Sequence, residues 1–288
     1  MAEISASAVM KLRKLSGQGM MDCKKALGEA DGDIDKAMDL LRKKGLATLA
    51  KRAERETSNG LVVSKMSDDG KTGVLVTLCC ETDFVAKNED FIAAAQTLAD
   101  YALCCSADEG TENLLQTSSN GRTFSDILTE VVSKTGEKTL VGDYARFTLA
   151  GPGLIVAYIH FNSKVGTMLE IETSDDNVAH ADSVKQAAYD IAMHVTASKP
   201  MALDQSGIDP EVIEREKAVY AEQVKNKPQE IIERIVEGKM KKFYADNCLL
   251  DQPFVKDDSK SIQQVLVEAA KQAGGQATVR RFARFEVG

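Results

Sequence analysis

The sequence predicts an α+β protein with a helical segment at its N-terminus and a helical hairpin inserted near its C-terminus. The first 55 residues carry helical periodicity and no strand pattern. Two blocks rich in β-branched residues follow, at 61–78 and 139–172, and a helical pattern comes after each. Two amphipathic helices at 205–245 then separate the second block from a final strand at 277–287. A chain of 288 residues is long enough for two domains, or for one domain with appendages.

Composition excludes several classes of function. The net charge of −8 and the absence of Trp argue against direct binding of nucleic acid, which needs cationic contacts to phosphate and rings for base stacking. No apolar run approaches the roughly 18 residues that a membrane span requires. The first residues, Met1 to Ser5, resemble neither a signal peptide nor a transit peptide. The 6 cysteines are therefore expected to be reduced thiols, and the protein to be cytoplasmic.

Residues 1–55 are predicted to form three short helices. Ser5 is the expected N-cap of the first helix, and the second begins near Met21. The third is expected to end at Gly45, and 51–58 reads as a polar helix tail and linker. The expected buried faces are Val9, Leu12 and Leu15, then Cys23, Ala26 and Leu27, then Ile34, Ala37, Met38 and Leu41.

A β-hairpin and a helix are predicted next, joined by a corner. The apolar segments 61–63 and 73–78 flank the turn 68–71, which has hairpin chemistry. Phe84 lies at the corner, outside both apolar patterns, so its ring either packs back under the helix or is offered to a partner. Asn88 is the expected cap of a helix whose apolar face is Phe91, Ile92, Ala95, Leu98 and Ala102.

The order of strand, acidic corner and helix occurs twice. A capping box at Thr123–Asp126 opens a helix that Gly136 ends, before the second strand block. The helix after that block is expected at 178–197. The segments 73–102 and 166–195 thus share one pattern, which predicts a degenerate internal duplication.

The segment 205–245 is predicted to be an antiparallel helical hairpin. Asp209-Pro210 is an N-cap followed by Pro at the first helical position, and 226–228 turns the chain. Because the hairpin interrupts a strand-rich block, it should protrude. Its apolar stripes either bind another chain or fold back on their own domain. Ser261 then opens one more helix before the final strand.

No catalytic, cofactor or metal site is predicted. Gly70-Lys71-Thr72 resembles the end of a phosphate-binding loop, but Lys65 occupies the place of the first Gly. The cysteines of Cys79-Cys80 are adjacent on a strand, so their thiols should point to opposite faces and not share a zinc ion. The three histidines are scattered, and none forms a recognisable set with a nucleophile and an acid.

Two stretches of the sequence, 12–27 and 81–88, resemble the two signatures of the elongation factor Ts family. Three departures from the family pattern are Ser16 in place of Thr, Gln18 in place of Ala, and 161–163 (Phe-Asn-Ser) in place of a glycine-rich stretch. Shorter matches follow in the right order, at 32–34, 158–160, 193–195, 197–200, 236–243, 252–255 and 284–288.

The resemblance implies a guanine-nucleotide exchange factor that promotes GDP release from elongation factor Tu, with no cofactor and no catalysis of its own. It also implies an architecture and a possible homodimer through the hairpin. The implied parts are a three-helix, ubiquitin-associated-like domain at 1–55, a core N-subdomain at 56–138, a related core C-subdomain at 139–204 and 246–288, and the dimerisation-type hairpin at 205–245.

The resemblance further implies roles for particular residues. Asp83 and Phe84 would intrude into elongation factor Tu and disturb its magnesium and phosphate contacts, with Phe84 in a pocket between helices. The surface around Lys24 would grip the nucleotide-binding domain, and Gly136 and His160 would make further contacts. The implied partner-binding residues are Thr82, Asp83, Phe84, Val85, Arg13, Met20, Met21, Lys24, Gly136 and His160.

Two other hypotheses stay open at the level of the residues. Residues 1–55 could act as a ubiquitin-associated-type adaptor, which would bind its partner alone and leave the core dispensable. A thiol enzyme that combines Cys79 or Cys80 with His160 is a more distant alternative, and it requires that alkylation of the thiols abolish function.

Overall fold

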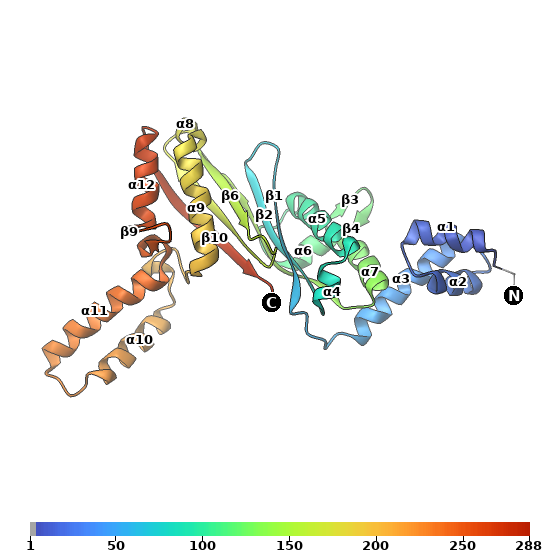
Figure 1. The fold of residues 1–288 in the computed structure, drawn as a ribbon, viewed down its shortest axis with the longest axis horizontal. Helices are drawn as coiled ribbons and strands as arrows, with labels where there is room; N and C mark the ends of the chain where they lie inside the picture. Colours follow the sequence, from blue (N-terminus) through green and yellow to red (C-terminus); the bar gives the residue numbers. More distant parts are fainter. Residues whose placement is uncertain (1–3) are drawn as a thin grey trace.

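The computed structural model of the chain describes residues 4–288 and shows a mixed α+β protein (Figure 1). Met1, Ala2 and Glu3, which belong to the N-terminus that we compared with a signal peptide, lie outside the described residues. The N-terminal helices occupy one end of an elongated molecule and the helical hairpin the other, with two small antiparallel sheets between them. No described helix is long and apolar enough to cross a membrane.

Three helices form at the N-terminus, as predicted: α1 (Ala6–Ser16), α2 (Met20–Glu29) and α3 (Ile34–Lys51). The Ser5 side chain caps α1 and accepts a hydrogen bond from the Ala8 N–H at 3.2 Å. The predicted buried face of α1 is wrong at Leu15, which is exposed. The buried stripe is Val9, Leu12 and Ser16, and Leu15 lies about a quarter turn away from it.

Gly45 does not end the third helix, which continues to Lys51. It lies instead where α3 crosses α7 (Phe124–Thr135), and a Cβ atom at this position would come within 2.5 Å of the Thr129 carbonyl oxygen. Ser133 of α7 also donates a hydrogen bond to the Leu41 carbonyl at 3.1 Å. The glycine therefore permits a close helix crossing that joins the N-terminal helices to the core.

The first sheet has the order β1-β2-β5, with β1 (Asn59–Met66), β2 (Thr72–Cys80) and β5 (Thr139–Thr148) antiparallel. The β1–β2 hairpin turns at Gly70, whose φ is +68°, as the turn chemistry predicted. The placement of β5 differs from our expectation, because it pairs with β2 and not with the second block. The sheet of the first subdomain thus extends beyond residue 138. Sequence analysis missed this because the pairing of β5 with β2 is a long-range contact that the local sequence does not reveal.

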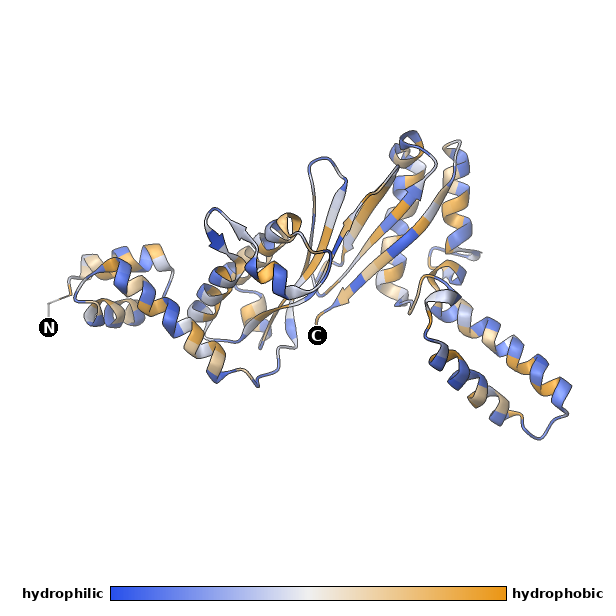
Figure 2. Ribbon diagram, turned by 180° about the vertical axis from the view of Figure 1, so that it is seen from behind, coloured by the Kyte–Doolittle hydropathy of each residue, from blue (hydrophilic) through white to orange (hydrophobic). Residues whose placement is uncertain are grey.

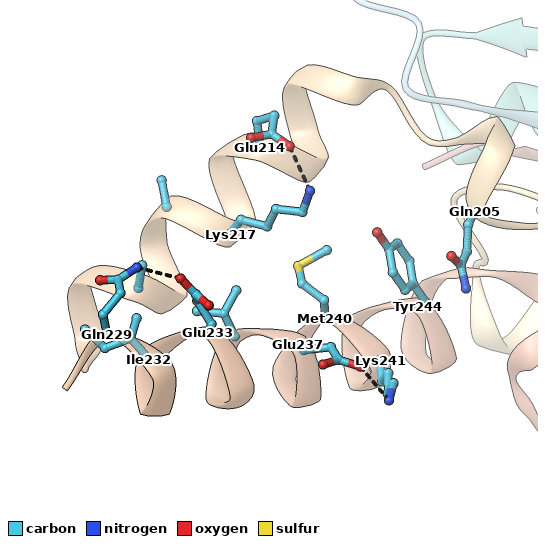
Figure 3. A pocket seen from close by; sticks show the side chains of 13 residues that line it. Gln205, Glu214, Lys217, Gln229, Ile232, Glu233, Glu237, Met240, Lys241 and Tyr244 are labelled. Atoms are coloured by element: carbon cyan, nitrogen blue, oxygen red, sulfur yellow. Dashed lines mark hydrogen bonds and ion pairs between the residues drawn. The ribbon is translucent and has the colours of Figure 1, made fainter. Parts of the chain in front are cut away.

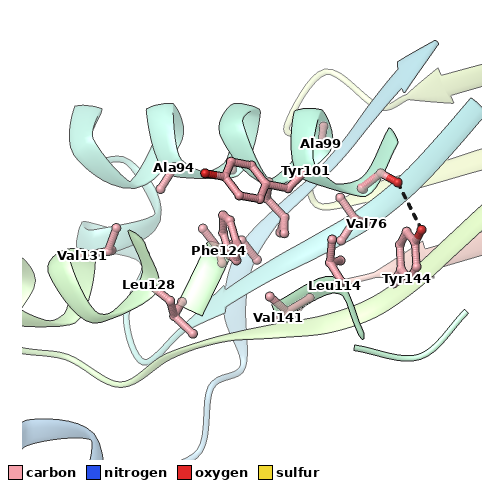
Figure 4. Close-up of a cluster of buried hydrophobic side chains, with 14 of the residues drawn as sticks. Val76, Ala94, Ala99, Tyr101, Leu114, Phe124, Leu128, Val131, Val141 and Tyr144 are labelled. Carbon is pink, nitrogen blue, oxygen red and sulfur yellow. Dashed lines mark hydrogen bonds between the residues drawn. The ribbon is translucent and has the colours of Figure 1, made fainter. Parts of the chain in front are cut away.

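Helices α5 (Glu89–Cys104), α6 (Thr111–Gln116) and α7 pack on one face of this sheet, with the short pair β3 (Ser118–Ser119) and β4 (Arg122–Thr123) beside them. Ile92 is exposed, contrary to prediction. Phe124 meets the Tyr101 ring edge-on at 5.7 Å between centroids (Figure 4). The Tyr144 hydroxyl lies within hydrogen-bond distance of the Ala107 carbonyl, at 2.8 Å, and of the Ala102 carbonyl, at 3.2 Å.

The second sheet has the order β10-β7-β6. The helix expected at 178–197 is divided in two at Ala181, whose φ of −64° and ψ of 136° are extended. In both sheets the central strand leads into a short helix and then a long one, namely α4 and α5 after β2, and α8 and α9 after β7. The elements are β6 (Gly153–Ile159), β7 (Val165–Thr173), β10 (Ala277–Glu286), α4 (Asp83–Ala86), α8 (Asp176–His180), α9 (Asp182–Ser198) and α12 (Ile262–Gln272).

The two sheets pack on each other through the faces that their helices leave uncovered. Leu75 and Cys79 of β2 meet Ile155 of β6 and Met168 of β7 in a shared apolar layer. Cys80 points the other way, into the layer under α5, so adjacent thiols occupy opposite faces as predicted. Burial raises the pKa of the Cys80 thiol to about 12 and also raises that of Cys79.

Helices α10 (Pro210–Gln223) and α11 (Gln229–Asn247) form a hairpin that protrudes from the second sheet (Figure 1). Asp209 caps α10 and Pro210 begins it, as predicted. Hydrophobic and hydrophilic residues alternate along both helices (Figure 2). The short elements around the hairpin are η1 (Gln205–Gly207), η2 (Leu249–Asp251), β8 (Pro253–Phe254) and β9 (Asp257–Ser261).

The close crossing of α3 and α7 gives a first testable prediction. Gly45→Ala should lower the free energy of unfolding by about 1–3 kcal/mol, because the added methyl group clashes with the backbone of α7. Gly28→Ala is the matched control, since Gly28 is an exposed glycine inside α2 with open space around it. It should be neutral or stabilise by up to about 1 kcal/mol. Urea unfolding checks both variants, and equal stability of the two would contradict the crossing.

Candidate functional site

The corner between β2 and α5 is a one-turn helix, α4, held between two caps. Thr82 caps α4, and its hydroxyl accepts a hydrogen bond from the Val85 N–H at 3.4 Å. Asn88 caps α5 and accepts from the Asp90 N–H at 2.9 Å, as predicted. The chain therefore changes direction over residues 82–88 with each turn fixed by a side-chain cap. Sequence analysis predicted the corner but not the short helix.

Helix α4 presents Phe84 to solvent. The Phe84 residue is 82% exposed, whereas Ala86 is buried and Val85 packs partly against the first core. Asp83, beside Phe84, forms an ion pair with Lys87 one turn later, at 2.7 Å. Of the two alternatives for this ring, packing under the helix is excluded and exposure is observed. What the ring contacts in function stays a prediction.

Two carboxylates fix the backbone beneath α4, and we call this set of contacts the corner network (Arg52, Glu81, Thr82, Glu137 and Lys138). The Glu81 carboxylate accepts two hydrogen bonds from the Arg52 guanidinium, at 2.8 and 2.9 Å, and one from the Lys138 N–H at 2.7 Å. The Glu137 carboxylate accepts from the Thr82 N–H at 3.1 Å and from its hydroxyl at 2.8 Å. The network thus ties the end of α3 and the start of β5 to the residues that precede Phe84.

Two acids of the corner, Glu81 and Asp83, are held in their charged forms. Burial opposes ionisation of Glu81, whose side chain is only 12% exposed, but the Lys138 N–H and the Arg52 guanidinium together lower its pKa. The hydrogen bond from Lys87 is the main cause that lowers the pKa of Asp83, and the charge of Lys164 adds to it. A fixed negative charge therefore stands next to the exposed ring.

The predicted residues of the N-terminal helices form a separate surface. Arg13 lies in the last turn of α1, and Met20, Met21 and Lys24 lie on α2. All four are exposed. Figure 1 shows α1 and α2 at the end of the molecule, away from α4. The structure therefore does not bring these residues together with Phe84, and the two sets can act only as two contact surfaces joined by α3.

Gly136 and His160 lie on other elements, one after α7 and the other after β6. Gly136 ends α7 with φ of +72°, directly before Glu137 of the corner network. His160 follows β6, where its Nδ1 atom lies 3.1 Å from the Tyr158 hydroxyl. Its ring lies 4.4 Å from that of Phe161, measured between centroids. Gly136 thus has a structural role here, and a partner contact by either residue stays a prediction.

Sequence analysis missed the residues that hold the corner in place. Arg52 lies in the charged stretch that we read as linker, and Glu137 follows the glycine that ends α7. Phe161, a highly exposed ring, was noted only as a departure from a family pattern. A charged residue next to a helix end was the only available signal for the first two.

The thiol-enzyme alternative does not fit the geometry. Cys79 and Cys80 are both buried, and burial raises the pKa of each thiol. A nucleophilic cysteine needs a lowered pKa and access to substrate. These thiols therefore act as small apolar side chains of the two core layers.

Comparisons with known proteins agree with the resemblance. A family model described as "Elongation factor TS" matches residues 81–288. An elongation factor Ts of a Nitratiruptor species is 42% identical over 287 residues, covering 99% of this chain and 93% of the relative. That of Alkalilimnicola ehrlichii is 43% identical over 287 residues, covering 99% and 92%. That of Chlorobium phaeobacteroides is 40% identical over 293 residues, covering 100% of both chains.

The corner network gives a second prediction. Glu81→Gln should lower the free energy of unfolding at neutral pH by about 1–2 kcal/mol, because charge-assisted hydrogen bonds are lost. The pKa of Glu81 is lowered from its ordinary value of 4.5, so its contribution is present above pH 4.5 and is lost as the pH falls through the folded-state value. The difference between parent and variant should therefore shrink in acid.

Denaturant unfolding between pH 7 and pH 3 measures this difference. Asp100→Asn, which removes an exposed ion pair with Lys65, is the control and should change stability by less than about 1 kcal/mol. A difference for Glu81→Gln that does not depend on pH would show that the carboxylate charge is not what stabilises the corner.

Proposed function

The chain belongs to the elongation factor Ts family, and from this membership we propose that it binds elongation factor Tu–GDP and promotes GDP release through Asp83 and Phe84. As a member of the family it is a nucleotide exchange factor of translation elongation and not an enzyme. The family match covers 81–288, which holds the core apart from β1 and β2 and does not include the three N-terminal helices. The adaptor hypothesis, which makes the core dispensable, therefore loses its support.

The observation that carries the proposal is the exposure of Phe84 on a backbone that is already fixed. Moving one such ring from water into an apolar pocket contributes about 1.5–3 kcal/mol. The corner network and the two caps hold α4 before any partner arrives, so little backbone entropy is lost on binding. Thr82 caps α4 and Val85 packs against the core, so both residues help to fix the helix that carries the ring.

Exchange follows from thermodynamic linkage. A factor that binds nucleotide-free elongation factor Tu more tightly than the GDP-bound form must weaken GDP binding by the same ratio. We place Phe84 in a pocket between helices of the GTPase and Asp83 beside its magnesium and phosphate site, where a second negative charge disfavours the bound phosphates. One ring accounts for roughly one to two decades of affinity, so other contacts are required.

The remaining contacts are assigned to two further surfaces. Arg13, Met20, Met21 and Lys24 on the N-terminal helices would hold the nucleotide-binding domain of the GTPase, since they combine exposed sulfur-containing side chains with two cations. Gly136 and His160 would contact the partner from the core. These assignments rest on the resemblance and on the exposure of α1 and α2.

The finer reading of the fold is also a proposal. We propose that α1 to α3 form a ubiquitin-associated-like domain and that the two sheets with their helices are related halves. The shared order of central strand, short helix and long helix supports the duplication. The division at 1–55, 56–138, 139–204 with 246–288, and 205–245 stays a prediction, apart from β5, which pairs within the first sheet. We also propose that the protein acts in the cytoplasm, where its partner works.

We propose in addition that the α10–α11 hairpin binds a second copy of the chain. The hairpin encloses an apolar groove of about 680 Å³, into which Met240 points from α11 toward α10 (Figure 3). Ion pairs between Glu214 and Lys217 and between Glu237 and Lys241 lie at its rim. An apolar floor with a charged rim is the usual composition of a protein–protein contact.

The role of Phe84 gives the third prediction. Phe84→Ala should slow the stimulated release of GDP from elongation factor Tu by roughly 10- to 100-fold, since the binding energy of one ring is lost. Release of a fluorescent GDP analogue in a stopped-flow instrument measures the effect. The unfolding midpoint of the variant should match the parent, because the ring is exposed.

Val219→Ala is the control for this experiment. It removes an exposed apolar side chain from α10, far from α4, and should leave GDP release unchanged. If Phe84→Ala accelerates release as well as the parent does, the intruding role of this ring is wrong, although family membership stands.

The hairpin gives the fourth prediction. The parent should show the mass of two chains by light scattering, and Ile232→Asp, which charges the groove, should show the mass of one. Val219→Asp adds the same charge to α10 outside the groove and should leave the dimer intact. A parent that is monomeric at concentrations of tens of micromolar would exclude the hairpin as a dimer contact.

A further inference from the structure

Phe161 is the most exposed large hydrophobic residue among residues 4–288, at 89%. It stands at the tip of the turn between β6 and β7. The turn is held by hydrogen bonds from the Ser163 N–H to the His160 carbonyl, at 2.8 Å, and from the His160 N–H to the Val165 carbonyl, at 2.9 Å. The backbone that presents the ring is therefore fixed, although the ring does not belong to a core.

This turn lies on the same side of the molecule as α4. The Val62 N–H of β1 donates to the Ser163 carbonyl at 2.7 Å, and α4 packs on β1. Lys164 of the turn is near enough to Asp83 for its charge to favour the ionised acid. The C-terminus, where the Val287 N–H bonds to the Lys164 carbonyl, lies near α4 in Figure 1. Two exposed phenylalanines thus stand on neighbouring, rigid supports.

Phe161 is also the end of a continuous row of rings, the aromatic strip (Phe161, His160, Tyr158 and Tyr189). Ring centroids are separated by 4.4 Å between Phe161 and His160, 6.1 Å between His160 and Tyr158, and 5.6 Å between Tyr158 and Tyr189. The strip runs from the turn along the edge strand β6 to α9. Rings in mutual contact lose little conformational freedom on binding and offer a large apolar area, which suits a protein contact.

We propose that Phe161 is a second aromatic contact for the GTPase that α4 binds, and that it seats on an apolar patch of the partner next to the pocket of Phe84. The inference rests on the proposed function, because the partner is the same. Continuity with α4 selects this partner. Phe161 lies three residues before Lys164, whose charge acts on Asp83, so the ring lies within the footprint of a protein that covers Phe84. A second copy of this chain is less well placed, because its proposed groove lies on the hairpin at the far end of the molecule (Figure 1).

The first test is affinity. Phe161→Ala should raise the Kd for nucleotide-free elongation factor Tu roughly tenfold, whereas Phe161→Tyr should keep most of the affinity because the ring remains. The unfolding midpoints of both variants should match the parent, since the ring is exposed. Val219→Ala, at an exposed apolar site remote from α4, should bind as the parent does.

The second test places a probe at the position itself. The chain contains no Trp, so Phe161→Trp made with 5-fluorotryptophan gives a single fluorine signal. Adding nucleotide-free elongation factor Tu should shift or broaden that signal, and Val219→Trp with the same label should not respond. A signal that moves with the concentration of this chain alone would assign the ring to a second copy and overturn the inference.

The outcomes separate this inference from the proposed function. If the parent stimulates GDP release and Phe84→Ala impairs it, while Phe161→Ala binds as tightly as the parent and the fluorine signal stays fixed, only the inference is overturned. If the parent neither binds elongation factor Tu nor releases GDP, both proposals are overturned. A weakened Phe161→Ala together with a shifted fluorine signal supports the second contact.

Discussion

The ionic hydrogen bonds of Glu81 and Glu137 are the constraint on which the rest of the candidate site depends. A carboxylate that is almost fully removed from water destabilises a fold unless donors replace the lost hydration. Glu81 meets this requirement with Arg52 and the Lys138 N–H, and the half-buried Glu137 accepts two hydrogen bonds from Thr82. The three segments that supply these groups end or begin at the corner, so satisfying two acids also fixes the direction in which α4 leaves the sheet. The exposure of Phe84 is a consequence of that fixed direction.

The same network links the corner to the N-terminal helices. Arg52 is the residue that ends α3, and α3 is an 18-residue helix, about 27 Å long, whose first half packs against α1 and α2. The crossing with α7 at Gly45 fixes the orientation of α3 relative to the first sheet and its helices. The surface of Met20 and Lys24 and the surface of Phe84 are therefore connected by one stiff element. Two contacts on a stiff connector reach a single partner together, because the first binding event raises the effective concentration of the second.

Local features of the fold could be predicted from sequence, and long-range features could not. Ser5, Asn88, Thr123 and Ser261 all cap the predicted helices, since a cap depends on residues within one turn. Gly45 was predicted to end the third helix, as a glycine at a helix end often does. The position instead requires glycine because Thr129 of α7, far along the chain, lies too close for a side chain. The pairing of β5 with β2 was missed for the same reason.

The candidate site shows the same division. Its position at the corner followed from the strand and helix patterns on either side, but composition left the ring of Phe84 with two possible directions. The contacts that decide between them join Glu81 to Arg52, 29 residues away, and Thr82 to Glu137, 55 residues away. Neither Arg52 nor Glu137 stands out from other charged residues in the sequence. Only the folded arrangement shows that these charges set the direction of the ring.

Rigidity has a direct consequence for exchange. A ligand shifts an equilibrium between two states of its partner only by the difference between its affinities for them. An aromatic residue on a flexible backbone could bind both states of a GTPase equally well. It would then promote little nucleotide release, however tightly it bound. The backbone of α4 is fixed by two caps and by the hydrogen bonds of Glu81 and Glu137, so under the proposed function the Phe84 ring would make its full contact only with the state of the GTPase whose pocket fits it. The free energy of burying that ring would then appear as a difference between the two states, and by reciprocity the bound nucleotide would lose the same amount of binding free energy.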